Sequence, residues 1–195
     1  MDIVEESKTL SAICVLPTYN EKNTIAEIIE CIFELQNEIN NFTLKVLVVD
    51  DMSPDGTGDI VLGLMKKYQN LSLIQGAKMG LGAAYIRGIR EAIDKLGADV
   101  IIQMDSDGQH DPNVIKNFLL LTSEYDVVIG SRFTEGGKVI DFSMWRLFLS
   151  LFGNFLVRYL GGAYLIKDCT SGFRSINVSI LKKCDLKNFP TKGYS

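Results

Sequence analysis

Short apolar runs alternate with segments of helical periodicity through the first two thirds of the chain, and this alternation limits the fold most. The apolar runs cover residues 12–16, 44–49, 71–74, 100–104 and 125–129, and the helix-like segments cover residues 23–39, 58–68, 81–96 and 112–122. Each apolar run is almost unbroken, as expected for a strand that is buried on both faces. The order predicts an α/β fold with a mostly parallel central sheet and helices on both faces.

Polar side chains gather where these predicted strands end. They are Thr18, Asn20 and Glu21 after the first run, Asp50 and Asp51 after the second, Asp105 and Asp107 after the fourth, and Ser131 and Arg132 after the fifth. The carboxyl ends of parallel strands lie along one edge of an open sheet, which is where ligands bind. We therefore expect one cleft that collects all of these groups.

The fourth run ends abruptly in two carboxylates, Asp105 and Asp107, which are followed by Gln109. Alternate side chains of extended backbone lie on the same side, so these three groups converge if the chain stays extended. Two close carboxylates repel each other unless a cation lies between them, and hard oxygen ligands suit Mg²⁺ or Mn²⁺ better than Zn²⁺. The motif predicts a metal-bound anionic ligand, with a diphosphate as the first expectation.

The composition narrows the class of protein. A chain of 195 residues with 47% hydrophobic residues can bury one substantial core, so we expect a single domain. The formal net charge is −4 and no basic run is present, which argues against nucleic-acid binding. We expect reduced core thiols and a cytoplasmic protein, because residues 1–10 lack a signal-peptide pattern and no Cys-x-x-Cys spacing links Cys14, Cys31, Cys169 and Cys184.

The other acidic candidates each have a binding and a structural interpretation. Asp50 and Asp51 can accept hydrogen bonds from ribose hydroxyls or a base N–H, but Asp50 can also cap its turn and Asp55 the next helix. Asp168 lies in a polar turn, where it can orient or deprotonate an acceptor or simply hold the turn through local hydrogen bonds.

The basic and glycine-rich candidates also have more than one interpretation. Arg132, Arg146 and Arg174 can each bind a phosphate or pair with a surface acid. We expect His110 to support the site from behind its ligands, or to contribute to the start of the following helix, rather than to act as a base. The glycines of Gly80-Leu81-Gly82 do not complete Gly-x-Gly-x-x-Gly, so they predict the start of a helix beside the cleft and not a dinucleotide site.

Six motifs follow one another along the chain: Pro17-Thr18-Tyr19-Asn20-Glu21, Asp50-Asp51-x-Ser53-x-Asp55-Gly56-Thr57, Gly80-Leu81-Gly82, Asp105-x-Asp107-x-Gln109-His110, Gly130-Ser131-Arg132 and Thr170-Ser171-Gly172-Phe173-Arg174. In this order they resemble the motifs of the family 2 glycosyltransferases, and within them those of the polyprenol-phosphate sugar transferases of the dolichol-phosphate mannosyltransferase type. Each motif alone is a weak signal, but their order is specific. The resemblance covers residues 11–195.

The resemblance implies a GT-A fold, a divalent cation, and inverting transfer of a hexose, first of all mannose, from GDP-mannose or a UDP-hexose to a polyprenyl phosphate. By matching position it assigns nucleoside binding to Pro17, Tyr19, Glu21, Val49 and Asp51. It assigns binding of the metal and the donor diphosphate to Asp105, Asp107 and Gln109. It assigns a contact with the donor to Ser106 and binding of the phosphates to Arg132 and Arg146. It makes Asp168 the base or positioning group for the acceptor, so Asp168, Asp107 and Arg132 are the catalytic candidates.

Two other functions fit the same motifs. One is a family 2 transferase that acts on a glycan or protein acceptor, and the other is a non-catalytic nucleotide-sugar-binding module. The spacers in Asp105-Ser106-Asp107-Gly108-Gln109 differ from the Ala and Leu of the mannosyl enzymes, which leaves the sugar open. The nucleobase is open too, because a ribose-directed carboxylate suits GDP and UDP alike.

The last third of the chain carries two further expectations. The segment from Trp145 to Tyr159 would form a helix with apolar side chains around most of its circumference. Such a helix can pack on the domain or lie at a bilayer surface. The second interpretation implies peripheral contact with the cytoplasmic face of a membrane. The family continues past Lys192-Gly193-Tyr194, so we expect residues 1–195 to form one GT-A domain that is truncated at its C-terminus.

Overall fold

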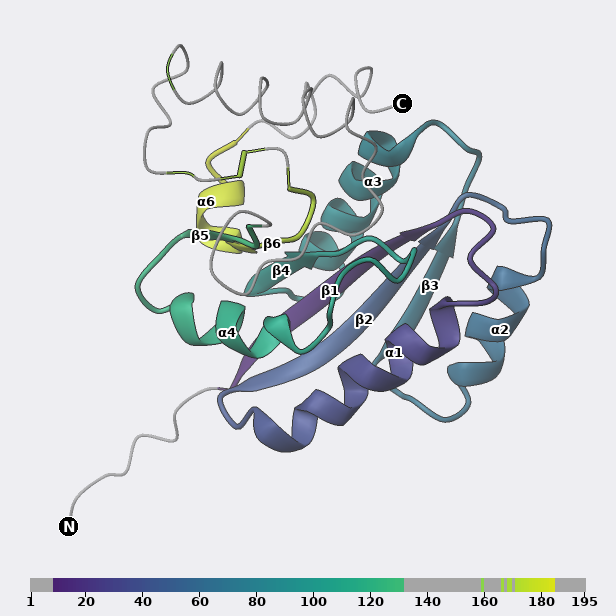
Figure 1. Cartoon of the computed structure of the whole chain (residues 1–195), viewed down its shortest axis with the longest axis horizontal. Helices are drawn as coiled ribbons and strands as arrows, with labels where there is room; N and C mark the ends of the chain where they lie inside the picture. Colours follow the sequence, from purple (N-terminus) through teal and green to yellow (C-terminus); the bar gives the residue numbers. More distant parts are fainter. Residues whose placement is uncertain (1–8, 132–158, 160–165, 167, 170, 185–195) are drawn as a thin grey trace.

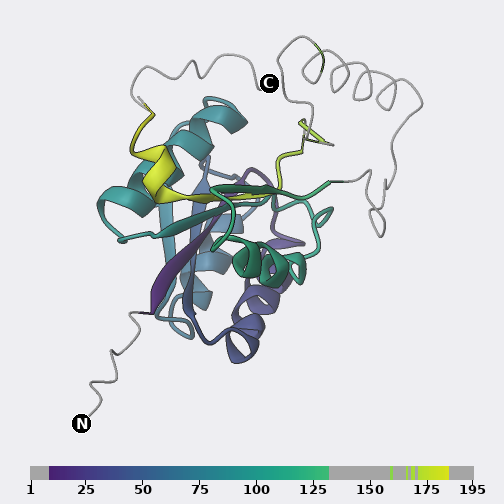
Figure 2. The ribbon, with the colours of Figure 1, turned by 90° about the vertical axis from the view of Figure 1, so that its left-hand side faces the viewer.

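The computed structural model describes residues 9–131, 159, 166, 168–169 and 171–184. A six-stranded sheet runs through the centre in the order β3-β2-β1-β4-β6-β5, with helices packed against it (Figure 1). Helices α3 and α6 lie on one side of the sheet and α1 and α4 on the other (Figure 2). The predicted α/β class, with helices on both faces, is confirmed.

All five predicted strands are present, and the helices begin close to their predicted starts. The strands are β1 (Leu10–Thr18), β2 (Phe42–Asp50), β3 (Leu71–Gln75), β4 (Val100–Gln103), β5 (Val127–Ile129) and β6 (Arg174–Asn177). The helices are α1 (Ile25–Glu34), the 3₁₀ turn η1 (Leu35–Glu38), α2 (Thr57–Leu64), α3 (Leu81–Asp94), α4 (Val114–Leu121) and α6 (Val178–Leu181). The helix predicted over residues 58–68 ends early, at Leu64.

Strand β6 was not predicted from the sequence. Strands β1 to β4 pair in parallel, whereas β6 is antiparallel to both β4 and β5. Its four residues follow a polar turn and carry Arg174 and Asn177, so the local pattern shows no apolar strand. The strand is formed by long-range pairing, which a local pattern does not report. Its position brings the preceding Gly172 next to Asp105 at the end of β4.

The sheet separates two apolar cores. In β1, Cys14 and Leu16 face the core with α1, α2 and α4, and Ile13 and Val15 face the core with α3 and α6. Helix α1 contributes Ile25, Ile28, Ile29 and Ile32, all buried and at helical spacing. Each fully buried isoleucine contributes about 1.5–3 kcal/mol of hydrophobic stabilisation. The strands are thus held rigidly, and their carboxyl ends form a fixed platform.

Helix α3 packs very closely on this platform. A Cβ atom at Gly88 would lie 2.5 Å from Val15 Cγ1 and 2.7 Å from Val49 Cγ2, so only glycine permits this approach. The helix begins at Leu81, as the glycine pattern predicted. Its first turns therefore lie over the carboxyl ends of the strands.

The cysteine prediction is confirmed only in part. All four cysteines are free, but only Cys14 is buried, and Cys184 is exposed. Burial raises the pKa of the Cys14 thiol far above its ordinary value, so this thiol stays protonated.

The membrane-contact prediction lies mostly outside the described residues. Of the segment 145–159, only Tyr159 is described, and its side chain is exposed. None of the helices in the described part of the chain is both long enough and apolar enough to span a bilayer.

Candidate functional site

The loops that follow β1 and β2 are tied together by their polar motif residues. The backbone N–H groups of residues 20, 21 and 22 donate to three side chains: Ser53 Oγ at 3.0 Å, Thr57 Oγ1 at 3.0 Å and Asp55 Oδ2 at 3.1 Å. Asp55 also accepts from the N–H of Thr57, the first residue of α2. These side chains therefore hold the loop that carries Tyr19 and Glu21 against the end of β2.

A second set of bonds ties the β4 loop to the β1 loop. Ser106 is buried, and its hydroxyl donates to the carbonyl of Pro17. The Thr24 hydroxyl donates to the carbonyl of Ser106 at 2.7 Å. The three loops therefore form one connected edge, as predicted from the positions of their polar residues. The predicted donor contact of Ser106 stays a prediction, and its hydroxyl has a partner inside the protein.

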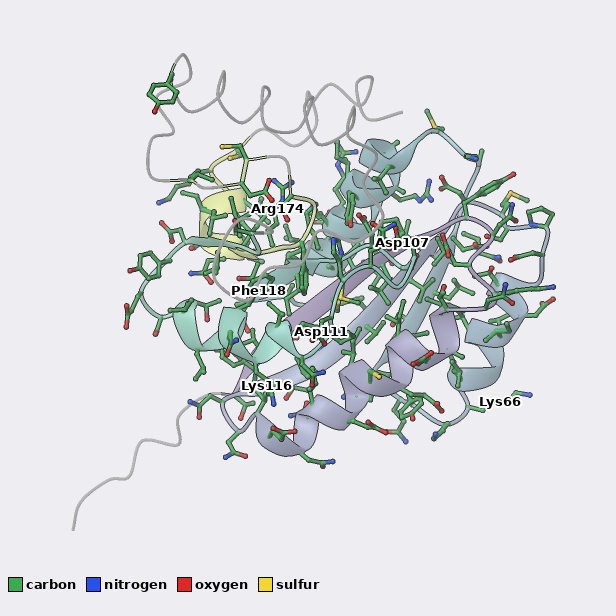
Figure 3. All side chains as sticks on the ribbon, viewed as in Figure 1. Lys66, Asp107, Asp111, Lys116, Phe118 and Arg174 are labelled. Atoms are coloured by element: carbon green, nitrogen blue, oxygen red, sulfur yellow. The ribbon has the colours of Figure 1, made fainter. Side chains whose placement is uncertain are left out.

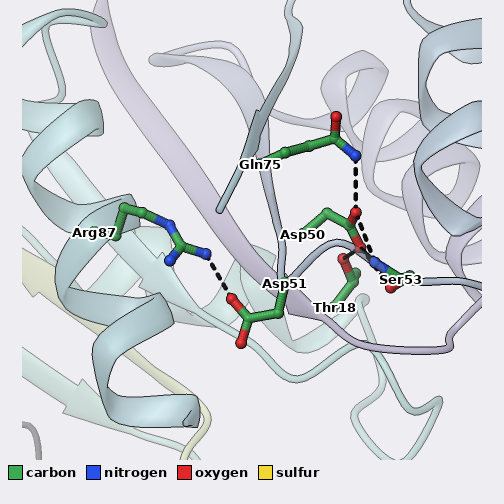
Figure 4. Close-up of polar contacts among 6 residues, drawn as sticks. All are labelled: Thr18, Asp50, Asp51, Ser53, Gln75 and Arg87. Carbon is green, nitrogen blue, oxygen red and sulfur yellow. Dashed lines mark hydrogen bonds and ion pairs between the residues drawn. The ribbon is translucent and has the colours of Figure 1, made fainter. Parts of the chain in front are cut away.

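Asp50 has a structural role. Its side chain is 0% exposed and accepts hydrogen bonds from Thr18 Oγ1 at 3.1 Å, Gln75 Nε2 at 3.0 Å and the Ser53 hydroxyl at 2.5 Å (Figure 4). The backbone N–H of Ser53 also donates to it. A carboxylate with this many donors is stabilised in its charged form and has no oxygen left for a ligand. The interpretation of Asp50 as a turn cap is confirmed.

Asp51 differs from its neighbour, because one basic side chain holds it. Arg87 of α3 donates from Nη2 to Asp51 Oδ1 at 2.6 Å, and the Asp51 side chain is 7% exposed. The second carboxylate oxygen accepts no hydrogen bond from the described residues and points away from Arg87 (Figure 4). Asp51 therefore keeps one acceptor for a ligand, as its predicted role at the nucleoside requires.

Asp105 is oriented by a buried tyrosine. Tyr85 of α3 donates its hydroxyl to Asp105 Oδ1 at 2.7 Å, and the backbone of Gly172 approaches Asp105 Oδ2 closely enough to leave little room for a side chain. Burial, and then the charge of Asp105, raise the pKa of Tyr85 well above its ordinary value. Tyr85 is therefore a permanent hydrogen-bond donor to this carboxylate.

His110 closes the same loop. Its Nδ1 accepts a hydrogen bond from the Asp105 backbone N–H at 3.1 Å, and its ring stacks on Phe173 with centroids 4.8 Å apart. An accepting Nδ1 requires the unprotonated nitrogen. This structural role agrees with the expectation that His110 is not a catalytic base.

The assumption that the chain stays extended from Asp105 to Gln109 is wrong. The backbone bends after β4, and Gly108 has φ of 80°, in the left-handed region that favours glycine. The N–H of Gln109 donates to Asp107 Oδ1 at 2.9 Å across this bend. Alternation of side chains along a strand therefore does not set the relative positions of Asp105, Asp107 and Gln109. Asp107 and Gln109 are both exposed, and Asp107 lies at the edge of the sheet (Figure 3).

Glu21 shows that the acidic groups of this edge act on one another. Partial burial raises the pKa of its carboxyl, the Thr24 hydroxyl lowers it in part, and the charges of Asp107, Asp55 and Asp105 raise it further. The carboxylates of the β2 and β4 loops are thus close enough to act on Glu21 of the β1 loop. Such an edge favours a cation, which suits the hard oxygen donors present.

This electrostatic fit is the observation that supports Mg²⁺ or Mn²⁺ here. Asp105 and Asp107 can supply carboxylate oxygens, and Gln109 can supply an amide oxygen. Within the described part of the chain, no group of three acidic, histidine or cysteine side chains is arranged closely enough to form a metal cluster. The metal ligands Asp105, Asp107 and Gln109 therefore stay a prediction.

The remaining predicted nucleoside contacts lie in different environments. Tyr19 is exposed, and Lys78 Nζ lies 3.4 Å above the centroid of its ring. Val49 is 0% exposed and packs in the core against α3, so its side chain is not available to a ligand. Pro17 is buried and contributes the carbonyl that Ser106 binds. Tyr19 is thus the accessible side chain of these three.

The predicted acceptor and phosphate groups are described only in part. Asp168 is 1% exposed, and Arg174 donates from Nη2 to the carbonyl of Ser171 at 2.8 Å. Arg174 lies at the start of β6 (Figure 3). Arg132 and Arg146 lie outside the described residues, and their roles at the phosphates stay predictions.

Tyr85 and Arg87 are the functional residues that sequence reasoning missed. Both lie in α3 and contact the two carboxylate positions of the site. A tyrosine on the apolar face of a helix needs a partner for its hydroxyl, which was the available signal. Which carboxylate each residue would reach depended on the packing of α3 across the sheet.

A cavity of about 450 Å³ lies along α3, away from the acidic edge. Its lining consists of Met79, Ala83, Ile86, Arg87, Arg90, Glu91, Asp94 and Lys95. It shares only Arg87 with the site described above.

The backbone resembles solved glycosyltransferase structures. With S. aureus TarS 1–349 in complex with UDP the TM-score is 0.63 at 22% identity, over 95% of this chain and 52% of that chain. With the mannosyltransferase PcManGT from Pyrobaculum calidifontis, in complex with GDP-Man and Mn²⁺, it is 0.59 at 17% identity, over 93% of this chain and 48% of that chain. These likenesses show the GT-A glycosyltransferase fold.

The sequence relatives define the family. The model of glycosyl transferase family 2 matches residues 13–185. The chain belongs to glycosyl transferase family 2 and is a glycosyltransferase. The family resemblance seen in the sequence motifs is therefore confirmed.

Two curated relatives have the predicted type of acceptor in their names. The undecaprenyl-phosphate mannosyltransferase of Micrococcus luteus is 34% identical over 95% of this chain and 74% of its own length. The polyprenol monophosphomannose synthase of Mycolicibacterium smegmatis is 34% identical over 95% of this chain and 69% of its own length. This chain spans about half the length of the two solved structures above.

Proposed function

We propose that this chain catalyses metal-dependent, inverting transfer of a hexose, with mannose as the first candidate, from a nucleotide-sugar donor to a polyprenyl phosphate. The two named relatives support the sugar and the lipid acceptor. The single observation in the structure that carries the proposal is the shared edge of the sheet that holds Asp51, with one oxygen that accepts no bond from the described residues, and Asp105, oriented by Tyr85.

The protein side of the mechanism begins with donor binding. Asp51 accepts a hydrogen bond from the nucleoside, and Tyr19 provides an exposed ring nearby. Asp105 and Asp107, with Gln109, would hold a divalent cation, which supplies charge neutralisation for the departing diphosphate. Tyr85 keeps the Asp105 carboxylate in one orientation, so the site does not reorganise when charge develops.

The acceptor step needs positioning more than proton removal. A phosphate monoester has a second pKa of about 6 and is largely dianionic at neutral pH. Its oxygen is already a nucleophile, so holding it in line with the anomeric carbon is the main requirement. Arg132 and Arg146 are the candidates that hold the phosphates, and Asp168 is the candidate base or positioning group beside the acceptor.

Calorimetric titration with GDP and UDP, each with and without Mn²⁺, tests donor binding directly. The proposal expects Mn²⁺-dependent binding of one nucleotide, and preference for GDP would support mannose. A transfer assay then compares polyprenyl phosphate with a glycan acceptor under the same conditions. Absence of nucleotide binding, or transfer to the glycan alone, would overturn the proposal.

We also propose that the protein works at the cytoplasmic face of a membrane as a peripheral protein, because its proposed acceptor is a lipid. Co-sedimentation with liposomes that contain polyprenyl phosphate tests this. The proposal expects binding that depends on the lipid phosphate, and a protein that stays in the supernatant would contradict it.

A further inference from the structure

We propose that Arg87 is a positioning residue for nucleoside recognition, which acts by fixing the Asp51 carboxylate in the one orientation that leaves an oxygen available to a nucleoside hydrogen-bond donor. The inference rests on the proposed function, because it assigns a role to a residue of the donor site. Neither the sequence motifs nor the family resemblance includes Arg87.

The contact between the two side chains is well suited to this task. Arg87 Nη2 lies 2.6 Å from Asp51 Oδ1, in a place where Asp51 is 7% exposed. A buried carboxylate without a cation would be unstable in its charged form. Arg87 supplies that cation from α3, whose position is fixed by the close approach of Gly88 to the sheet.

The guanidinium group also makes fewer bonds than its geometry permits. An arginine fork commonly binds a carboxylate through two parallel N–H bonds. Here one bond to Asp51 is made, and Arg87 Nε is buried without a hydrogen-bond partner among the described residues. A contact through one oxygen leaves Asp51 Oδ2 as an acceptor, whereas a two-bond contact would occupy both oxygens.

Gly76 provides an independent sign that the guanidinium position matters. A Cβ atom on Gly76 would lie 3.0 Å from Arg87 Nη1 and 3.1 Å from Arg87 Cζ, so the guanidinium lies against bare backbone at the end of β3. The same residue donates its N–H to the carbonyl of Asp50. A side chain at position 76 would therefore force the Arg87 guanidinium to shift by a few tenths of an ångström.

The test compares Arg87→Met with Arg90→Met, which removes the same charge from the same helix, outside the donor site. Calorimetry measures the affinity for the nucleoside diphosphate that the wild type prefers, and for pyrophosphate, both with Mn²⁺. Arg87→Met is expected to weaken nucleotide binding by about tenfold or more and to leave pyrophosphate binding within about twofold. Arg90→Met is expected to leave both unchanged, and Gly76→Ala to weaken nucleotide binding in the same direction as Arg87→Met.

A double variant separates positioning from a structural role. If Arg87 acts through Asp51, Asp51→Asn combined with Arg87→Met binds nucleotide no more weakly than Asp51→Asn alone. Additive losses, an equal loss of pyrophosphate binding, or unchanged nucleotide binding in Arg87→Met would each overturn the inference. A wild type that binds no nucleoside diphosphate would instead overturn the proposed function, and this inference with it.

Discussion

The carboxylates at the end of β2 and those at the end of β4 lie along the same edge of one sheet, but their hydrogen-bond partners differ. Asp50 accepts from three side chains and Asp51 pairs with an arginine. In the described part of the chain, Asp107 accepts one backbone N–H from its own turn, and the charges of Asp105 and Asp107 act on Glu21.

The difference separates Asp50, which builds the site, from the carboxylates that can bind a ligand. A carboxylate surrounded by donors is satisfied within the protein, and its removal leaves those donors buried without partners. Among the described residues, Asp105 accepts the Tyr85 hydroxyl and Asp107 accepts one backbone N–H, so each keeps an oxygen for a cation. The β2 end is therefore largely preorganised, and the β4 end is completed by its ligand.

The largest effect is expected for Asp107→Ala, which tests the β4 end. Loss of a metal-directed carboxylate should lower sugar transfer by about a thousandfold, because the departing diphosphate loses its stabilisation. The exposed position of Asp107 predicts little change in the thermal unfolding midpoint. A transfer assay with Mn²⁺ and a thermal melt measure the two quantities.

Asp111→Ala is the matched control, because it removes an exposed carboxylate from the same loop on the side nearer to α4 (Figure 3). Its transfer rate should stay near that of the wild type. Transfer at the wild-type rate in Asp107→Ala, with Mn²⁺ present, would show that the β4 end does not bind the catalytic metal.

The next effect is on stability and tests the β2 end. Asp50→Ala should lower the free energy of unfolding by about 3 kcal/mol, because the donors of Thr18, Ser53 and Gln75 lose a buried acceptor. Urea unfolding measures the change. The control Asp126→Ala removes an exposed carboxylate and should change stability by less than about 0.5 kcal/mol. Equal stability of the two variants would refute the structural role of Asp50.

Sequence reasoning found the sheet and the acidic edge because both depend on local patterns. Apolar runs of strand length predicted β1 to β5, and the polar residues after them predicted where Asp51 and Asp105 lie. The bend at Gly108 is also local, because a glycine with positive φ and a bond between Gln109 and Asp107 form it. Two features depended on distant parts of the chain instead: the antiparallel strand β6, and the contacts of Tyr85 and Arg87. Local periodicity cannot report such contacts, because the packing of α3 and the pairing of β6 decide them.

Tyr85→Phe sharpens the comparison because it removes a hydrogen bond at the β4 end only. The variant removes the hydroxyl that orients Asp105 and keeps the ring in the core. Groups that orient metal ligands typically change metal affinity by tenfold to a hundredfold, so we expect a loss of about tenfold in Mn²⁺ affinity. Electron paramagnetic resonance of free Mn²⁺ measures it without a transfer reaction.

Tyr125→Phe, on an exposed tyrosine, should bind Mn²⁺ as the wild type does. Unchanged affinity in Tyr85→Phe would mean that Asp105 does not need this bond.

The smallest effect concerns the repulsion at Glu21. Its pKa is raised above the ordinary value of 4.5, first by burial and then by neighbouring carboxylates, so the folded protein holds this proton more tightly than the unfolded chain does. The stabilising contribution of the protonated form is therefore present below the ordinary pKa and lost as the pH rises through the raised one.

Glu21→Gln cannot lose that contribution, so without metal it should be more stable than the wild type at neutral pH. The gain should be a few tenths of a kcal/mol, because solvent screens much of the repulsion at this partly exposed group. It should vanish at pH values below the ordinary pKa, where Glu21 is protonated in both states. Urea unfolding of both proteins across this pH range measures it, with and without Mn²⁺. A bound cation removes the repulsion but not the cost of burial, so Mn²⁺ should reduce the advantage of the variant. If the wild type were the more stable protein at neutral pH without metal, the acidic edge would not be repulsive, and the contrast between the two ends of the site would fail.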